Sequence, residues 1–282
     1  MSRMIRAAAA PTTPLATVEA LIRDVVAEEA TPRFGKLADA DITEKKGPLD
    51  LVTVADRRIE ERLTEALAAL LPGSAVIGEE AVHADPSLRD ALLGEDPVWI
   101  IDPIDGTSNF VRGVPSFVTL VALAQGGELL ASWIHHPVSG RMAVARRGEG
   151  ALLDGEPLRL TPPNGGEAAE VLHMASARPE HLTAEQYDRF YGLGPAHGIK
   201  ACASGSAGCD YLDVARGQLD AVTYVYDNPW DHSAGILLVA EAGGAVLRAD
   251  GSGPWRMADG AQPFAAGRDA VAARRVAGLL SA

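Results

Sequence analysis

Acidic side chains stand at the ends of predicted elements at four places in the chain. They are Asp50 and Asp56, Glu79 and Glu80, Asp102 and Asp105 in IIDPIDGTSNF (100–110), and Asp231 in PWDHSAG. Strand ends in an α/β protein gather along one edge of the sheet, where ligands usually bind. Carboxylates brought together there repel one another unless divalent cations lie between them. Such hard oxygen ligands favour magnesium or manganese, whereas zinc more often takes His and Cys, which no cluster here supplies at ligand spacing.

Each acidic residue also has an ordinary structural explanation. Asp56 can complete a capping box with Thr53 at the start of a helix. Asp105 is a typical turn residue before a glycine, and Asp231 can cap a helix that begins at His232. It is the joint pattern of the four places that favours a metal site.

The spacing within DPIDG (102–106) suits such a site. The proline fixes φ, so that both aspartates turn toward a common point, and the carbonyl of Ile104 can also face a metal. Gly106 allows the backbone to approach closely. Thr107 and the amides after it lie where the N-terminus of a helix could receive a phosphate.

Composition limits the classes of function. The chain has 282 residues, 47% of them hydrophobic and 22% charged, which is typical of a folded globular protein. Its formal net charge of -13 argues against a nucleic-acid or anionic-membrane surface. An acidic protein needs metal cations to bind a phosphorylated substrate, because carboxylates and phosphates repel. Two cysteines and no signal-peptide pattern favour a reducing cytoplasm, and the first residues are predicted to be frayed.

The elements that must position these residues follow from the patterning. Helical spacing of apolar residues predicts helices over about 13–30 and 53–71. Short buried strands are expected at AVIGEE (75–80) and PVWIID (97–102), each running into acidic residues. The stretch 117–160 predicts antiparallel strands with a first turn at Gly-Gly.

A Pro- and Gly-rich segment, TPPNGGEAAE (161–170), predicts a boundary between subdomains 1–160 and 161–282, which together form one globular unit. Strand and helix patterns alternate after it, which is typical of α/β structure. Strands are expected at VLHMAS, LDAVTYV and AVLRAD, and helices at TAEQYDRFYGL, SAGCDYLDVARG and SAGILLVAEAGG.

Taken together, several segments resemble the signature set of the inositol monophosphatase family of metal-dependent, lithium-sensitive phosphatases. They are GEE, WIIDPIDGTSNF and PWDHSAG, with DLVTVAD upstream and GSAGCDYLDVARGQLDA before the last. The resemblance runs in the right order from about Leu15 to the end of the chain. It implies a layered αβαβα fold and a homodimer.

The resemblance also implies the roles of individual residues. Two or three Mg²⁺ ions, or Mn²⁺, would be held by Glu79, Asp102, the carbonyl of Ile104, Asp105 and Asp231. Asp56, beside Lys45, would help hold the water of a third metal. Asp56 and Thr107 would together orient the attacking water. Glu79, Thr107, Asp56 and Lys45 would form the catalytic group. Backbone amides of Gly106 and Thr107 would bind the phosphate.

The alcohol side of the site departs from the family pattern. Tyr224 occupies the position at which animal inositol phosphatases have a glutamate that holds sugar hydroxyls, and Lys200 and Cys202 lie where an arginine commonly precedes the GSA segment. The residues expected on this side are Gly205, Ser206, Ala207, Asp220, Tyr224 and Asp231.

The sequence therefore predicts a Mg²⁺-dependent phosphomonoesterase acting on inositol monophosphate or a similar small polyol phosphate. Histidinol phosphate is a second candidate substrate, and fructose 1,6-bisphosphate and adenosine 3',5'-bisphosphate stay open. A hypothesis of another class is a non-catalytic protein that acts on the transcription machinery, as some bacterial relatives do. That hypothesis predicts a damaged metal set, and the set here is intact.

Overall fold

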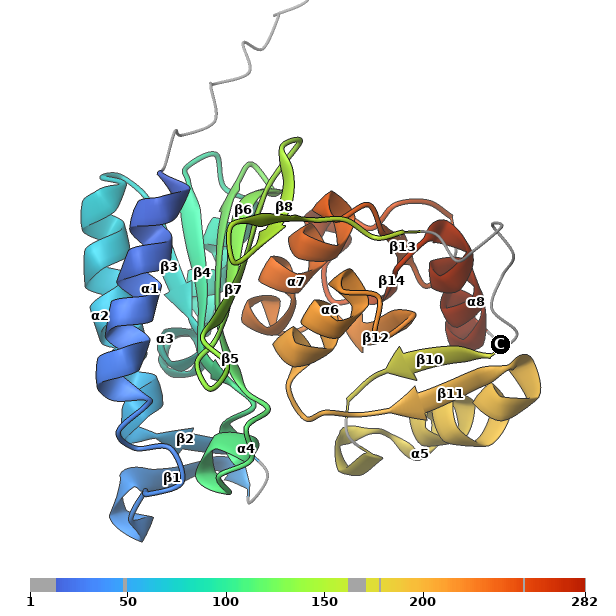
Figure 1. Ribbon diagram of the computed structural model, residues 1–282, viewed down its shortest axis with the longest axis horizontal. Coiled ribbons are helices and arrows are strands. Elements are labelled where there is room, and N and C mark those ends of the chain that lie inside the picture. The colour runs from blue at the N-terminus through green and yellow to red at the C-terminus, as the bar shows by residue number, and fades with distance from the viewer. Residues whose placement is uncertain (1–13, 48–49, 162–170, 178, 251, 282) are drawn as a thin grey trace, which may run out of the picture.

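Two long helices form the outermost layer of the protein (Figure 1). The computed structural model describes residues 14–47, 50–161, 171–177, 179–250 and 252–281. Helices α1 (Leu15–Glu29) and α2 (Val54–Leu70) lie side by side and bury their apolar faces against the first sheet. The capping box predicted for α2 is present: the Thr53 hydroxyl accepts from the amides of Ala55 and Asp56, and the Thr53 amide donates to the Asp56 carboxylate. The expectation of a frayed start lies outside the described residues.

The second layer is a seven-stranded sheet whose strands follow chain order. Its strands are β3 (Ala75–Gly78), β4 (Val98–Asp105), β5 (Val118–Gln125), β6 (Glu128–His136), β7 (Arg141–Arg146), β8 (Gly150–Leu153) and β9 (Glu156–Leu158). Only the β3–β4 pair is parallel among these seven, and the others pair antiparallel as predicted. The turn from β5 to β6 uses Gly126 and Gly127 at φ 59° and 74°, which glycine adopts without strain.

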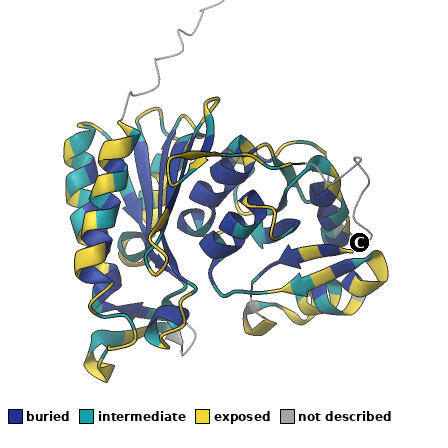
Figure 2. Cartoon of the chain, viewed as in Figure 1, coloured by how far each residue is buried: buried dark blue, intermediate teal, exposed yellow. Residues whose placement is uncertain are grey.

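Helices α6 (Ala207–Ala215) and α7 (Pro229–Glu241) lie between this sheet and a second one (Figure 1). Helix α7 has buried residues on every side because it packs on both sheets. Figure 2 shows dark blue, buried residues on these helices and on the strands that face them.

The second sheet has five strands in the order β11, β10, β12, β14, β13. Their bounds are β10 (Leu172–Ala175), β11 (Ile199–Cys202), β12 (Ala221–Val225), β13 (Ala245–Arg248) and β14 (Pro263–Gly267). Helix α8 (Ala270–Ser281) packs on β12, β13 and β14 and forms the last layer, while α5 (Ala184–Tyr187) continues into a π-helical turn over Asp188–Leu193. The layered αβαβα fold is thus confirmed. No described strand of either sheet crosses the proposed boundary at 160/161, which stays a prediction.

Several elements, most of them short, were not predicted from the sequence. They are the hairpin β1 (Ile42–Gly47) and β2 (Asp50–Thr53), helices α3 (Glu79–Ala84) and α4 (Thr107–Val111), strands β11 and β14, helix α8, and 3-10 turns at Asp39–Asp41, Pro86–Leu93, Pro179–His181, Gly194–His197 and Met257–Asp259. Most span four to six residues, which is too short for periodicity to appear. Across the described residues, no helix combines the length and the apolar character needed to cross a membrane.

Candidate active site

Four carboxylates from three elements line one cavity of about 830 Å³. Asp102 and Asp105 lie at the end of β4, Glu79 opens α3 where the parallel strand β3 stops, and Asp231 is the third residue of α7. Helix α7 begins at Pro229, so Asp231 is not the cap that its position beside His232 had suggested. The parallel β3–β4 pair ends at one sheet edge, which brings Glu79 close to Asp102.

Burial raises the pKa of these carboxylates. It raises the pKa of Asp102 and of Glu79 well above their ordinary values, and the negative neighbours raise the pKa of Asp102 further. Burial and the charge of Asp105 raise the pKa of Asp231 to about 7, while its hydrogen bonds with Asp102 and Asn228 oppose that shift. The cluster therefore holds its negative charge poorly unless a cation shares the site.

The donor set fits a hard divalent cation. Oδ1 of Asp102 is fully buried and has no hydrogen-bond partner among the described residues. A buried acceptor without a partner is costly, and a metal ion would satisfy it. No group of three or more Asp, Glu, His or Cys side chains in the described part of the chain forms a complete metal site. These side chains would therefore have to move in order to surround an ion, beginning with the hydrogen bond between Asp102 and Asp231.

Asp105 joins the first sheet to the central helices. Its carboxylate accepts from the hydroxyl of Ser206 at 2.7 Å and from the amides of Gly208 and Ala207 at 2.6 and 3.2 Å, at the N-terminus of α6. The positive end of a helix stabilises a negative charge there. Gly208 is required for this approach, because a Cβ atom would lie 2.4 Å from Val118 and 3.0 Å from Asp105.

A sharp turn after β4 places Thr107 against Asp56. Gly106 has φ 96°, a left-handed conformation that favours glycine, and it precedes α4. The Thr107 hydroxyl lies 2.9 Å from the carbonyl of Ile104 and 3.3 Å from the carboxylate of Asp56. Asp56 is buried, which raises its pKa to about 6 although hydrogen bonds from Thr53 favour its charged form.

Lys45 from the β1–β2 hairpin supplies a positive charge beside the cluster. Its ammonium group donates to Glu79 at 2.8 Å and to Glu80 at 2.5 Å. Burial alone would lower the pKa of Lys45, but these carboxylates raise it overall. The side chain of Asp50, on the next strand, lies outside the described side chains.

Two positioning residues were missed from the sequence. Glu60 on α2 accepts from the amides of Glu80 and Ala81 at 2.8 Å each, and it thereby holds the first turn of α3. Asn109 on α4 donates to the carbonyls of Ser116 at 2.6 Å and Ser204 at 3.0 Å. A charged or amide residue on an otherwise buried helix face is the signal that could have found both.

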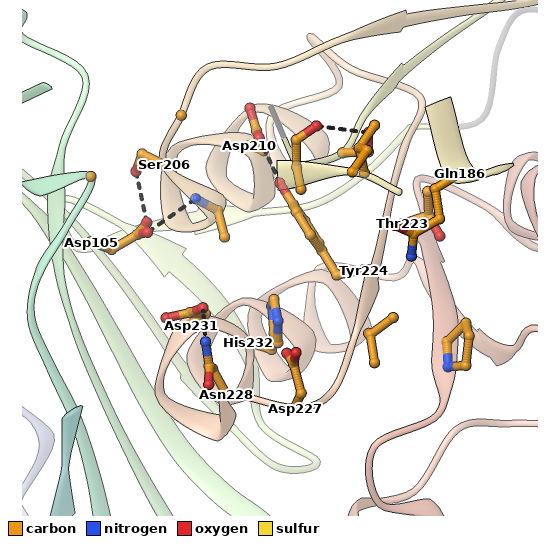
Figure 3. A pocket seen from close by; sticks show the side chains of 18 of the residues that line it. Asp105, Gln186, Ser206, Asp210, Thr223, Tyr224, Asp227, Asn228, Asp231 and His232 are labelled. Atoms are coloured by element: carbon orange, nitrogen blue, oxygen red, sulfur yellow. Dashed lines mark hydrogen bonds between the residues drawn. The ribbon is translucent and has the colours of Figure 1, made fainter. Parts of the chain in front are cut away.

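Tyr224 lines the part of the cavity that is expected to receive the alcohol of the substrate. Its hydroxyl donates to Asp210 at 2.7 Å, and its ring stacks on His232 with centroids 5.0 Å apart (Figure 3). His232 is buried, which lowers its pKa to about 3, so it is neutral near pH 7 and packs among aromatic rings. Asp210 had not been identified from the sequence, where it is one polar residue within a buried helix.

The other residues expected on the alcohol side divide into two groups. Gly205, Ser206, Ala207 and Asp231 line the cavity. Asp220 is not brought there: it precedes β12, pairs with Arg268 at 2.5 Å and accepts from the amide of His173. Cys202 is exposed, whereas Cys209 is buried.

Comparison with known proteins agrees with this geometry. The model of the inositol monophosphatase family matches residues 12–279. Human inositol monophosphatase 1 is 31% identical over 211 residues (73% of this chain and 74% of that protein), and inositol-1-monophosphatase of Mesorhizobium japonicum is 33% identical over 225 residues (77% and 79%). Nus factor SuhB of Pseudomonas aeruginosa is 34% identical over 214 residues (74% and 76%).

The fold likewise matches solved structures. An IMPase from Thermotoga maritima superposes with a TM-score of 0.75 at 25% identity, covering 94% of this chain and 95% of the other. A staphylococcal IMPase complexed with products gives a TM-score of 0.73 at 22% identity, covering 95% of each chain.

Proposed function

The chain belongs to the inositol monophosphatase family and is a phosphoric monoester hydrolase of that type, and we propose that it hydrolyses the phosphate ester of a small alcohol with Mg²⁺ at the site of Asp102. Inositol monophosphate or a similar polyol phosphate is the substrate class that the relatives' names indicate. The observation that carries the proposal is the unpartnered Oδ1 of Asp102 among three further carboxylates in one cavity. Another solved structure, at 23% identity, is that of an IMPase/NADP phosphatase complexed with Mg²⁺ and phosphate.

Each ligand has a proposed place. The residues that would hold two or three Mg²⁺ ions, or Mn²⁺, are Glu79, Asp102, Ile104 through its carbonyl, Asp105 and Asp231. Bound ions would lower the pKa of a water molecule and neutralise charge on the phosphate and on the leaving oxygen. The hydrogen bonds of Lys45 fix Glu79 in place from the side of the hairpin.

The remaining groups orient the reactants. The Thr107 hydroxyl, held by Asp56 and by the carbonyl of Ile104, is placed to accept a hydrogen bond from the attacking water. The amides of Gly106 and Thr107, at the start of α4, would bind phosphate oxygens. Gly205, Ser206 and Ala207 border the alcohol side.

Phosphate release tests the proposal directly. Purified protein with Mg²⁺ should release phosphate from inositol 1-phosphate, histidinol phosphate, fructose 1,6-bisphosphate or adenosine 3',5'-bisphosphate, and lithium should inhibit the release. Failure on all four substrates would overturn the proposed function. Ranking kcat/KM across them identifies the preferred alcohol.

Histidinol phosphate is a second candidate because of Tyr224. The hydroxyl of Tyr224 is engaged by Asp210, so this position presents a ring to the cavity where a carboxylate would bind sugar hydroxyls.

A scaffold role remains the hypothesis of another class, since one relative is named a Nus factor. The complete carboxylate set favours catalysis instead. We further propose a homodimer in the cytoplasm, a place that suits two free cysteines.

A further inference from the structure

The proposed metal ligands reach the cavity from two parts of the molecule. Glu79, Asp102 and Asp105 belong to the first sheet and to the helix α3 that follows β3, whereas Asp231 comes from α7 in the central helical layer. Binding of an ion by all four ligands therefore depends on how the start of α7 is held against the elements of the first sheet. Arg89 makes a connection of this kind.

Arg89 lies on the 3-10 helix Pro86–Leu93, which follows α3 directly. This segment packs on α3, β3 and β5, and it also contacts the turn Met257–Asp259. Leu88 from the same segment packs against the central hydrophobic cluster. The backbone that carries Arg89 is thus fixed to the first sheet and to the helix that begins with Glu79.

The guanidinium group of Arg89 contacts the segment that leads into α7. Its Nη1 atom donates to the carbonyl of Asp227 at 2.8 Å, and its central carbon lies 5.1 Å from the centre of the Trp230 ring. Trp230 is 6% exposed and belongs to the central hydrophobic cluster, so the cation lies over a ring that is fixed by packing. Arg89 therefore holds the chain on both sides of Asn228.

Asn228 passes this constraint to the metal ligand. Its side-chain amide donates to Oδ2 of Asp231 at 3.3 Å, and its carbonyl accepts from the Asp231 amide at 3.2 Å. Asp227, Asn228 and Asp231 all line the cavity (Figure 3). A shift of the segment that Arg89 holds would therefore move the Asp231 carboxylate relative to Asp102.

We propose that Arg89 is a positioning residue, which sets the metal affinity of the site by holding Asp231 in place against the ligands of the first sheet. The proposal rests on the metal-dependent function above and adds to it a residue outside the ligand set. Arg89 is exposed and does not line the cavity, so it acts through Asp227, Asn228 and Trp230.

The sign of the effect separates positioning from electrostatics alone. A cation near an acidic metal site repels a bound metal ion, so the loss of the Arg89 charge would by itself strengthen metal binding. The loss of a positioning contact instead weakens metal binding, because the ion must then order Asp231 when it binds. A substitution at Arg89 therefore has opposite expected results under the two explanations.

Titration of the metal-free protein with Mn²⁺ measures the affinity without catalysis, because electron paramagnetic resonance reports the free ion. We expect Arg89→Ala to raise the Mn²⁺ concentration at half-saturation about three- to tenfold, since an exposed charged hydrogen bond and a cation–π contact are each of modest strength. Arg89→Lys, which keeps a donor and a cation, should recover most of the affinity. At saturating Mg²⁺, kcat of Arg89→Ala should stay within threefold of the wild-type value.

A second substitution tests the route through Asn228. Asn228→Ala should also weaken Mn²⁺ binding, and the double variant with Arg89→Ala should show less than the product of the two single effects. Arg147→Ala is the matched control, since Arg147 is another half-exposed arginine, pairs with Glu128 and does not line the cavity. It removes the same charge and should change the half-saturation less than twofold. Thermal unfolding in EDTA checks that each variant is folded.

The outcomes separate this proposal from the proposed function. Equal or tighter Mn²⁺ binding by Arg89→Ala, no recovery in Arg89→Lys, equal weakening in Arg147→Ala, or fully multiplicative effects in the double variant would each overturn the positioning role. Wild-type protein that binds Mn²⁺ with the expected dependence on Arg89 but releases no phosphate from any ester would overturn the phosphatase function alone. Wild-type protein that binds no Mn²⁺ would overturn both.

Discussion

A single carboxylate in this site is destabilising without a cation beside it. Asp102 is 1% exposed, and its burial among negative neighbours raises its pKa well above the ordinary value. Buried charged residues that lower stability and lie at a ligand-binding edge of a sheet are typical of functional sites. Asp102 should therefore lower the free energy of unfolding while it raises the rate of the reaction.

Replacing Asp102 by Asn should separate these contributions. We expect Asp102→Asn to lower kcat by at least about 10³-fold, because several kcal/mol of charge stabilisation by the metal would be lost. Without Mg²⁺ the variant should be as stable as the wild type or more stable, since one buried charge is gone. Phosphate release and thermal unfolding in EDTA measure the two effects.

Asp90→Asn is the control, because Asp90 is exposed and does not line the cavity. Asp90→Asn should change neither kcat nor the thermal unfolding temperature in EDTA. Unchanged turnover in Asp102→Asn would show that the metal site is assigned wrongly.

His135 is a residue whose effect on stability should depend on pH. It is buried on β6, with Nδ1 3.0 Å from the carbonyl of Arg141, and burial lowers its pKa to about 4. The charges facing it are Arg23 and Glu19 from α1 and the neighbouring His136. Between pH 6.5 and 4 the unfolded chain binds a proton here that the folded protein does not, so stability falls as the pH falls through this window.

We predict that His135→Asn, whose amide can still donate to the Arg141 carbonyl, is less sensitive to acid. Between pH 7.5 and 5.5 the wild type should lose about 1 kcal/mol more unfolding free energy than the variant does. Urea midpoints at the two pH values measure the difference. His83→Gln, at an exposed histidine of α3, serves as the control. Identical losses in the wild type and His135→Asn would contradict the prediction.

At the scale of elements, the short helix α4 connects two parts of the site. It follows β4, which carries Asp102 and Asp105, and Asn109 on it reaches the loop before α6 through the carbonyl of Ser204. That loop carries Ser206, which in turn donates to Asp105. One buried amide thus fixes the distance between β4 and α6.

Asn109→Asp should therefore destabilise more than Asn109→Ala. Both variants remove the donor from two carbonyls, but the aspartate also places a charge against them, so we expect losses of roughly 2–3 and 1–2 kcal/mol. Urea unfolding measures these values. Equal losses in the two variants would contradict the expected repulsion between the aspartate and the carbonyls of Ser116 and Ser204.

At the scale of the whole molecule, the site lies where the layers meet. The seven-stranded sheet supplies Asp102 and Asp105, while the central helices supply Ser206 and Asp231. A cation bound by both would favour the assembled layers over the unfolded chain, because the unfolded chain does not gather these ligands.

Magnesium should consequently stabilise the folded protein. At 100 times its dissociation constant, one ion adds about 2.7 kcal/mol, which corresponds to a rise of about 5–10 °C in Tm for a chain of this size. Thermal scans with Mg²⁺ and with EDTA measure the shift. Asp102→Asn should show little of it, and an equal shift in that variant would place the bound ion elsewhere.

The sequence by itself determined the family, the layered fold and most long elements. Capping boxes, a Gly-Gly turn and helical spacing are local features, so they act before any tertiary contact forms. The candidate ligands Asp102 and Asp105 could be named for the same reason: both lie in one short segment at the end of a buried strand.

Only the tertiary structure decided which of the residues expected to bind the substrate alcohol line the cavity. Asp220 precedes β12 and Tyr224 lies near the other end of that strand, about 13 Å away along an extended chain, and of the two only Tyr224 lines the cavity. The partner of Tyr224, Asp210, comes from another element, and so do the amides that hold Asp105. Such pairings depend on how the layers pack. The sequence pattern of one segment therefore does not show which residues of another segment contact it.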